Sequence, residues 1–204
     1  MRNVLDRIAQ SVWACLATFA VLTAEGSESP QDPVEAVWKT HSLVFHYRNE
    51  GRLYSCDVLE HKVEMILRRL GARDRIEVRR VACRDLGGAA QIEVLMESPV
   101  IATAENIREI TQYNSQDELI ARVRGVQLAS PEDLQRFPAV WETISFRRDR
   151  KLHLDARDCA LVQQLRHQIL PQMSVQVLRD IDRVDCTQAS ARLTVQALVA
   201  TVQK

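Results

Sequence analysis

The spacing of apolar residues predicts one helix and three strands in the first half of the chain. The helix is indicated by five apolar residues that recur at the 3.6-residue period of one helix face: Leu59, Val63, Ile66, Leu67 and Leu70. Gly71 follows at a position where helices commonly stop. Residues 41–48 and 75–82 have the length and composition of strands, and residues 90–96 alternate apolar and polar side chains. The predicted order is β-α-β-β.

The second half of the chain repeats this order. Its helix is indicated by four residues on one face: Cys159, Val162, Leu165 and Ile169. Pro171 ends that helix, because proline cannot continue the helical hydrogen bonds. Strands are predicted at 142–148, from Val175 onward and at 193–199.

Cysteine and tryptophan positions indicate that the two halves are copies of one unit. Four of the five cysteines follow the N-terminal segment: Cys56, Cys83, Cys159 and Cys186. Both successive pairs are separated by 27 residues, and the pairs are offset by 103. Trp38 and Trp141 have the same offset, and Ala-Val precedes each of them. The prediction is an α+β fold made by tandem duplication of a β-α-β-β unit. Each unit is expected to have one helix packed on a small mixed sheet and one disulfide.

This duplication divides the chain into four predicted segments: a signal peptide at 1–26, a first unit at 27–102, a polar linker at 103–136 and a second unit at 137–204. The linker is polar and irregular, with short helical signals at 117–123 and after Pro131. The two tryptophans are expected to be core anchors at the entrance of each unit.

The N-terminal segment has the layout of a secretory signal. Arg2 and Arg7 precede an apolar stretch at 8–24, and small residues stand at Ala24 and Gly26. We expect cleavage near Gly26 and a periplasmic protein with no stable membrane span afterwards. The alternative is an uncleaved N-terminal anchor, because the apolar stretch approaches the length that crosses a bilayer.

Charge balance narrows the classes of partner. The chain has 27 Lys and Arg against 27 Asp and Glu, which gives a formal net charge of zero. A neutral chain has no overall field to recruit nucleic acid or an anionic membrane. Nucleic acid is therefore not expected as a partner.

The four cysteines allow three pairings, and the predicted lengths favour pairing within each unit. A helix of about 15 residues descends roughly 22 Å, and a following strand of about eight residues climbs roughly 26 Å. Cys56 and Cys83 would then meet at the same end, and Cys159 would meet Cys186 in the same way. The alternatives are bridges between the units, or a thiol redox or metal site.

A dense run of arginines is the candidate anion-binding site. The run comprises Arg68, Arg69, Arg73, Arg75, Arg79, Arg80 and Arg84, and the candidate anion-binding residues among them are Arg68, Arg69, Arg73, Arg79 and Arg80. Arginine forks suit phosphate or carboxylate groups, so this run could contact an anionic component of the cell envelope. The alternative is a solvated surface, in which the arginines at the helix C-terminus complement the helix dipole.

No residues are assigned to catalysis or to a metal. Glu60, His61 and Glu64 lie within about one helical turn and could support acid–base chemistry, but a solvated helix face is the favoured interpretation. The other histidines are His41, His46, His153 and His167. The odd spacing of His41 and His46 places them on opposite faces of a strand, so no metal or other cofactor is expected.

Residues 54–63, which read YSCDVLEHKV, precede Leu70-Gly71-Ala72-Arg73 and Cys83. This segment of roughly 30 residues resembles a family of uncharacterised exported proteobacterial proteins with a Y-S-C-D-x-L-E-x-K-V signature. Asp158-Cys159 and Cys186 fit the later half of that family, whereas Val58 is a departure, because glycine is expected at this position. The resemblance implies a bacterial envelope protein and supports the cysteine pairing, but it brings no activity or ligand.

The expected function is a non-enzymatic binding or scaffolding module in the periplasm. Its partner is expected to be an envelope protein or an anionic envelope component, which an exposed strand edge could capture without a special side-chain motif. One alternative is a hydrolase-like envelope enzyme with a cleft between the two units. A second alternative is a periplasmic metal-binding protein.

Overall fold

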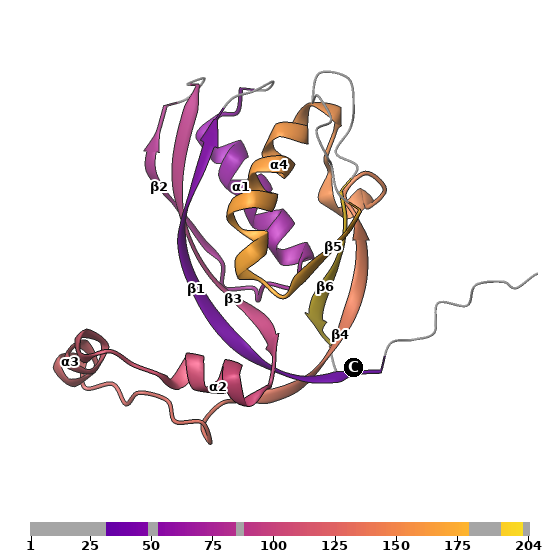
Figure 1. The fold of residues 1–204 in the computed structure, drawn as a ribbon. Helices are drawn as coiled ribbons and strands as arrows, with labels where there is room; N and C mark the ends of the chain where they lie inside the picture. The colour runs from indigo at the N-terminus through magenta and orange to yellow at the C-terminus, as the bar shows by residue number, and fades with distance from the viewer. Residues whose placement is uncertain (1–31, 49–52, 85–87, 180–192, 202–204) are drawn as a thin grey trace, which may run out of the picture. The chain divides into compact units, whose positions relative to one another are not determined.

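A six-stranded antiparallel β-sheet forms the frame of the protein in a computed structural model of the chain (Figure 1). The structure describes residues 32–48, 53–84, 88–179 and 193–201. The predicted signal peptide at 1–26 lies outside these residues. The strands are β1 (Val34–Arg48), β2 (Glu77–Cys83), β3 (Ala89–Ile101), β4 (Arg136–Ser145), β5 (Val175–Arg179) and β6 (Thr194–Ala200). The fold is α+β, as predicted.

In the residues that the structure describes, four α-helices and three short 3₁₀ turns accompany the sheet. The helices are α1 (Cys56–Arg69), α2 (Ala104–Thr111), α3 (Ser115–Arg124) and α4 (Cys159–Gln168). The 3₁₀ turns are η1 (Arg150–Leu152), η2 (Ala156–Asp158) and η3 (Leu170–Gln172). In the described part of the chain, no helix is both long and apolar enough to cross a membrane.

The sheet is continuous and antiparallel, which corrects the expected small mixed sheet in each unit. Its strand order is β2-β3-β1-β4-β6-β5, and every neighbouring pair is antiparallel. The strands that α1 connects, β1 and β2, are separated by β3, and those that α4 connects, β4 and β5, are separated by β6. Strands joined by a helix crossover therefore never pair directly, which removes the expected parallel contacts.

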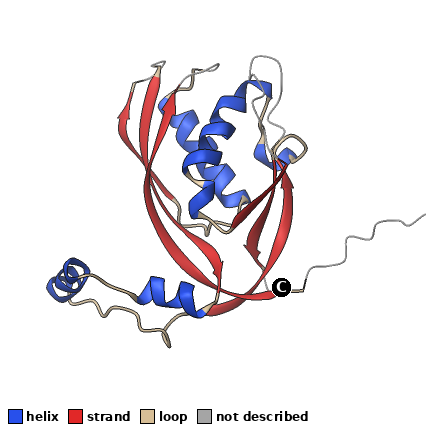
Figure 2. Cartoon of the chain, viewed as in Figure 1, coloured by secondary structure: helices blue, strands red, loops and turns tan. Residues whose placement is uncertain are grey.

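The two halves meet through β1 and β4, and then diverge. Residues 34–37 of β1 pair with residues 136–139 of β4, and no further pairs are formed between these strands in the described residues. Helices α1 and α4 lie between the strand group β2-β3-β1 and the group β4-β6-β5 (Figure 2). The remainder of each strand therefore packs against helices instead of against the other half.

One main core takes side chains from both halves. Phe45 and Leu67 come from the first half, Leu165 and Val195 come from the second, and none of the four is more than 1% exposed. The predicted helix stripes supply these contacts, because their apolar residues recur on the face that is turned toward the sheet. The predicted units therefore share their largest hydrophobic cluster.

A buried carboxylate also joins the halves. Asp158, just before α4, is fully buried and accepts hydrogen bonds from the Tyr54 hydroxyl and the Lys62 ammonium, which lies 2.8 Å from Oδ2. The Asp155 backbone N–H donates to the same oxygen at 2.9 Å. A buried charge requires such partners, so Asp158 ties α1 and its preceding residue Tyr54 to the start of α4.

The predicted Cys56–Cys83 disulfide is present, with Cα atoms 6.0 Å apart. Cys56 begins α1 and Cys83 ends β2, as the helix and strand lengths predict. Cys159 begins α4 in the same manner, is buried and is disulfide-bonded. Cys186 lies outside the described residues, so its pairing with Cys159 stays a prediction.

The structure retains the sequence offset of 103 residues in some places and not in others. Bulges interrupt the outer strand pairs opposite Gln91 and Ile92 in β3 and opposite Thr194 and Val195 in β6, which are 103 residues apart. Trp38, however, pairs with Pro99, whereas Trp141 pairs with Leu198. The tandem duplication therefore stays a prediction.

The predicted linker contains two helices. The helical signal at 117–123 falls within α3, and α2 precedes it. The residues after Ser130 form a turn in which Asp133 accepts hydrogen bonds from the Ser130 N–H and hydroxyl. Figure 1 shows α2 and α3 beyond the junction of β1 and β4, on the side away from α1 and α4. A 2.6 Å ion pair between Lys39 and Glu109 connects α2 to β1.

Candidate anion-binding site

The five candidate arginines of the predicted run are each paired with carboxylates. Arg68 lies in the last turn of α1 and donates to Glu64 at 2.7 Å and to Asp74 at 2.8 Å. Its pKa is raised above its usual value by the hydrogen bond to Glu64. This arginine is therefore neutralised by acids close to it in sequence.

Arg69 connects the two halves of the molecule. Its guanidinium donates to Glu142 of β4 at 2.6 Å and to Asp149 at 2.5 Å. The hydrogen bond to Glu142 is the main cause of the raised pKa of Arg69. Both partners lie more than 70 residues away in the sequence, so this pairing joins α1 to the end of β4.

The remaining three arginines lie along the edge of the sheet. Arg73 donates to Glu97 at 3.0 Å, and its guanidinium carbon stands 5.4 Å from the Trp38 ring centroid. Arg79 pairs with Glu77. Arg80 donates to two acids of α1, Asp57 and Glu60. The structure thus distributes the five arginines among separate ion pairs and does not gather them around one hollow.

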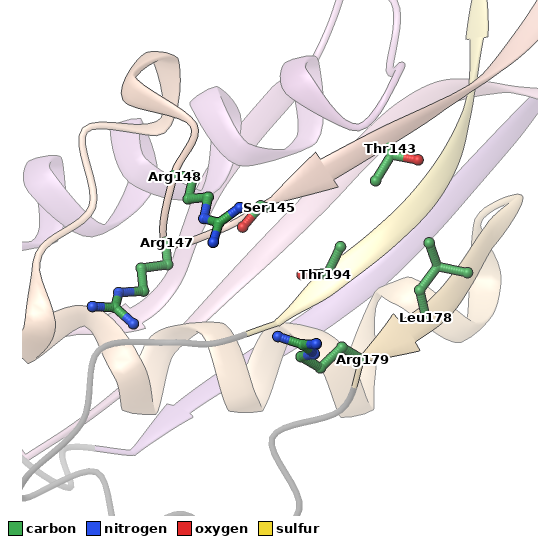
Figure 3. Close-up of a pocket in the computed structure, with 7 residues that line it drawn as sticks. All are labelled: Thr143, Ser145, Arg147, Arg148, Leu178, Arg179 and Thr194. Atoms are coloured by element: carbon green, nitrogen blue, oxygen red, sulfur yellow. The ribbon is translucent and has the colours of Figure 1, made fainter. Parts of the chain in front are cut away.

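A different group of arginines borders a hollow on the sheet. The hollow has a volume of about 580 Å³ and is lined by Thr143, Ser145, Arg147, Arg148, Leu178, Arg179 and Thr194. Figure 3 shows hydroxyl side chains on the strands and the arginines toward one end. We call this group the arginine hollow.

Strand register places three lining residues of the arginine hollow in one row. Ser145 of β4 stands opposite Thr194 of β6, and Thr194 stands opposite Arg179 of β5. The register shifts between Val177 and Arg179, so Leu178 is the extra residue of a β-bulge. The bulge brings Arg179 beside the two hydroxyl-bearing side chains.

Arg147 and Arg148 enter the arginine hollow from the turn that follows β4. The Phe146 N–H donates to the Leu193 carbonyl at 2.9 Å, and the Phe146 side chain is buried. The Arg148 N–H donates back to the Ser145 carbonyl at 3.0 Å, which closes the turn. Burial of the phenyl ring thus directs the following two arginines to the surface.

The three arginines of the hollow have no acidic partner among the residues that the structure describes. The acid next to them in sequence, Asp149, is engaged by Arg69. All three arginines are exposed. Guanidinium groups that have no acidic partner among the described residues, and that lie beside hydroxyl donors, suit an anion with several oxygen acceptors, such as a phosphate or carboxylate group.

The Glu60, His61 and Glu64 group lies on the surface of α1. Both of its carboxylates form ion pairs with arginines: Arg80 donates to Glu60 at 2.6 Å, and Arg68 donates to Glu64 at 2.7 Å. His61 is exposed. A hollow beside this group is open to solvent and lies between α1 and β2, within the first half. The space between the halves, where the alternative enzyme would have its cleft, is occupied in the described residues by the main core.

The histidines do not come together. Within the described ranges, no group of three His, Cys, Asp or Glu side chains is arranged to hold a metal ion. His41 is buried, and its Nε2 lies 2.9 Å from the Ser98 hydroxyl. The others are exposed: His46, His61, His153 and His167.

The two matched tryptophans lie at the junction of β1 and β4. Trp38 stacks on Phe137 with ring centroids 4.5 Å apart. Trp141 packs against a small second cluster formed by Ala36, Ala139 and Leu198. Both indoles are half-buried, so they anchor the strand junction and not the main core.

The sequence contains one local signal for the arginine hollow, although the basic run that forms it has fewer arginines than the one at 68–80. Residues 147–151 read RRDRK, a basic run that begins at the end of the predicted strand 142–148. The run at 68–80 has more arginines, and acids stand within both runs, at Asp74 and Glu77 in the first and at Asp149 in the second. Arg179 has no such local signal, because only the strand register and the bulge bring it near Arg147.

Comparison of the chain with known protein families, with characterised proteins and with solved structures found no match.

Proposed function

We propose that this protein is a non-enzymatic binding protein of the bacterial cell envelope, and that the arginine hollow binds an anionic group of its ligand. The observation that carries the proposal is the contrast between two sets of arginines. The five candidate arginines of the predicted run, among them Arg68 and Arg69, are neutralised by acids. Arg147, Arg148 and Arg179 have no acidic partner in the described residues and surround one hollow.

The chemistry of the lining supports binding in preference to catalysis. The hollow offers guanidinium and hydroxyl donors, and its apolar contribution is Leu178. General acid–base catalysis at neutral pH needs a group such as histidine or a carboxylate with a suitable pKa. None of the seven described lining residues is of that type.

Export is supported by the Cys56–Cys83 disulfide, because disulfides persist in oxidising compartments and are rare in the bacterial cytosol. The basic and apolar pattern at the N-terminus is consistent with this location. We therefore place the protein in the periplasm, where anionic envelope components are available as ligands. The repeated β-α-β-β order of elements supports duplication of one unit as the origin of this fold.

The test is a titration of the protein with inorganic phosphate and, separately, with succinate at constant ionic strength, followed by the side-chain Nε–Hε signals of arginine in NMR spectra. The signals of Arg147, Arg148 and Arg179 are expected to move. The variant R147A/R148A/R179A is expected to bind at least tenfold more weakly. The two probes distinguish a preference for phosphate from a preference for carboxylate.

The matched control is R79A/R136A/R157A, which removes the same number of positive charges. These arginines are exposed and are paired with Glu77, Glu35 and Asp155. Retained binding in the control together with loss in the hollow variant supports the site. Equal weakening in both variants, or no shift in the parent protein with either probe, contradicts it, since long-range attraction depends only on total charge.

A further inference from the structure

Helix α3 exposes a continuous apolar stripe. Leu119 is 58% exposed, Val123 is 78% exposed and Val126, just beyond the helix, is 60% exposed. The spacing of four residues places Leu119 and Val123 on one side of the helix, and Val126 follows directly after Gly125, where the helix ends. Ala121 is the buried residue of α3. Exposed apolar residues that cluster in this way mark an interaction surface more often than scattered ones do.

The helix that carries this stripe is well terminated at both ends. The Asn114 side chain accepts from the Asp117 N–H, and the Asp117 side chain accepts from the Asn114 N–H, which forms a capping box. Gly125 ends the helix in the left-handed conformation, with φ of 64°. The stripe is therefore presented on a defined helix.

The stripe borders a groove between α2, α3 and β1. The groove has a volume of about 530 Å³, and its apolar lining includes Ile110, Ile120, Val126 and Leu128. Val126 belongs to both the stripe and the groove. Apolar side chains that protrude therefore lie beside an apolar groove. A two-fold contact joins the same surface of two copies, so it requires a surface that fits itself in this way.

The charges of α3 are complementary to those of a second, antiparallel α3. Its first turn contains Asp117 and Glu118, and its last turn contains Arg122 and Arg124. Glu118 and Arg122 flank the same side of the stripe and form no ion pair within the described part of the chain. In an antiparallel pair, the acidic turn of each helix faces the basic turn of the other.

We propose that α3 pairs with α3 of a second copy of this chain in a two-fold antiparallel arrangement. Leu119 of each copy packs against Val123 of the other, and Glu118 of each copy lies near Arg122 of the other. A two-fold contact uses the same surface on both copies, which fits a helix with one apolar stripe and opposite charges at its ends. This proposal is independent of the arginine hollow.

The pairing is expected to be weak. One helix of ten residues covers less area than a standard stable interface, so we expect a dissociation constant on the order of 100 µM. The concentration of the protein then decides whether the monomer or the dimer predominates.

The first experiment is analytical ultracentrifugation of the protein from about 10 µM to 1 mM. The weight-average mass is expected to rise from that of a monomer toward that of a dimer. The variant V123E places a charge in the centre of the stripe and is expected to remain monomeric. The control V81E makes the same change at a residue of β2 that is 57% exposed, and it is expected to associate like the parent protein.

A charge exchange tests the antiparallel arrangement itself. E118R places positive charges at both positions 118 and 122, and R122E places negative charges at both. Each variant alone is expected to associate at least fivefold more weakly than the parent protein, since like charges then meet across the contact. An equimolar mixture is expected to form a mixed dimer, because every contact across the two-fold axis then joins opposite charges.

The outcomes are distinguishable because all of these side chains are exposed and the variants are expected to keep the thermal midpoint of the parent protein. A parent protein that stays monomeric at 1 mM overturns the proposal and leaves the stripe to a different partner. Association that V123E and V81E weaken equally, or a mixture of E118R and R122E that does not associate, overturns it as well.

Discussion

Among the Asp, Glu, Lys, Arg and His side chains of the described residues, Asp158 and His41 are the two that are buried. They differ in how their burial is compensated. Asp158 lies opposite the Lys62 ammonium, whereas His41 has a neutral partner, the Ser98 hydroxyl. A buried charged side chain stabilises the fold only while its oppositely charged partner is present. A buried side chain with a neutral partner is tolerated only while it is itself uncharged. This difference leads to separate predictions for stability.

Replacement of Asp158 by Asn is expected to lower the free energy of unfolding by about 3 kcal/mol, because the Lys62 ammonium, largely buried, loses its counter-charge. The measurement is the urea midpoint at neutral pH. The control D74N makes the same change in an exposed ion pair with Arg68 and is expected to cost less than about 0.5 kcal/mol. Equal effects of the two substitutions would show that Asp158 does not stabilise the contact between the halves.

Acid is expected to destabilise the protein through His41. Burial is the main cause that lowers the pKa of His41 below 6.5, Lys39 acts in the same direction, and Glu109 opposes it. Below pH 6.5, His41 therefore binds a proton more readily in the unfolded chain than in the folded one. The free energy of unfolding then decreases as the pH is lowered from 6.5 toward the pKa of His41 in the folded protein. Above pH 6.5 this contribution is fully present.

The measurement is the urea midpoint at pH 7.5 and 5.5. Between these values, H41Q is expected to lose less stability than the parent protein, with a difference of up to about 1 kcal/mol. The control H61Q changes an exposed histidine and is expected to retain the parent dependence. A parent-like dependence in H41Q would exclude His41 as the source.

At the scale of elements, two side chains of α4 form hydrogen bonds with the backbone of β1, in the part of the strand where β4 has diverged from it. Gln168 accepts from the His46 N–H and donates to the His46 carbonyl, both at 2.8 Å. Gln164 makes the same two contacts with Arg48, at 2.7 and 2.8 Å. The spacing of four residues on α4 places one amide side chain opposite every second residue of the strand. The helix thus substitutes for the missing strand neighbour.

Each glutamine is expected to protect its own backbone amide from hydrogen exchange. Q168A should accelerate exchange at His46 roughly fivefold and leave Arg48 nearly unchanged, and Q164A should have the opposite selectivity, since one hydrogen bond is worth about 1 kcal/mol. The measurement is amide exchange by NMR, and each variant serves as the control for the other. Acceleration at both amides in both variants would indicate general fraying of β1.

The sequence predicts local elements of this fold well and long-range pairing poorly. The stripe around Leu59 in α1 and the alternation of β3 are periodic signals that neighbouring residues alone create. The central contact between β1 and β4 joins residues about 100 positions apart, and no local pattern specifies it. The predicted disulfide between Cys56 and Cys83 succeeded because one helix and one strand determine its geometry.

The same distinction between local signals and long-range contacts applies to the arginines of the candidate site. Arg68 is neutralised by Glu64, four residues before it, which the sequence could have indicated. Arg69 is neutralised from β4, and Arg179 reaches the hollow through a bulge. Whether an arginine is paired therefore depends on tertiary contacts, which the density of arginines along the chain does not indicate.

At the scale of the whole molecule, the shared core determines how the two halves unfold. Leu67 of α1 and Leu165 of α4 belong to the same hydrophobic cluster, and both are almost fully buried. Asp158 and Arg69 add polar contacts between the halves. Neither half has a separate large cluster in the described residues, because α1 and α4 fill the space between the two strand groups.

We therefore expect one cooperative unfolding transition in which calorimetric and van't Hoff enthalpies agree. Each of L67A and L165A is expected to lower the stability of that single transition by about 2–5 kcal/mol, since each leaves a cavity in the common core. Differential scanning calorimetry measures both quantities, and the exposed-site substitution L119A serves as a control that should change stability by less than about 0.5 kcal/mol. Two separate transitions, with L67A affecting one and L165A the other, would instead mean that each β-α-β-β unit folds as an independent domain despite the continuous sheet.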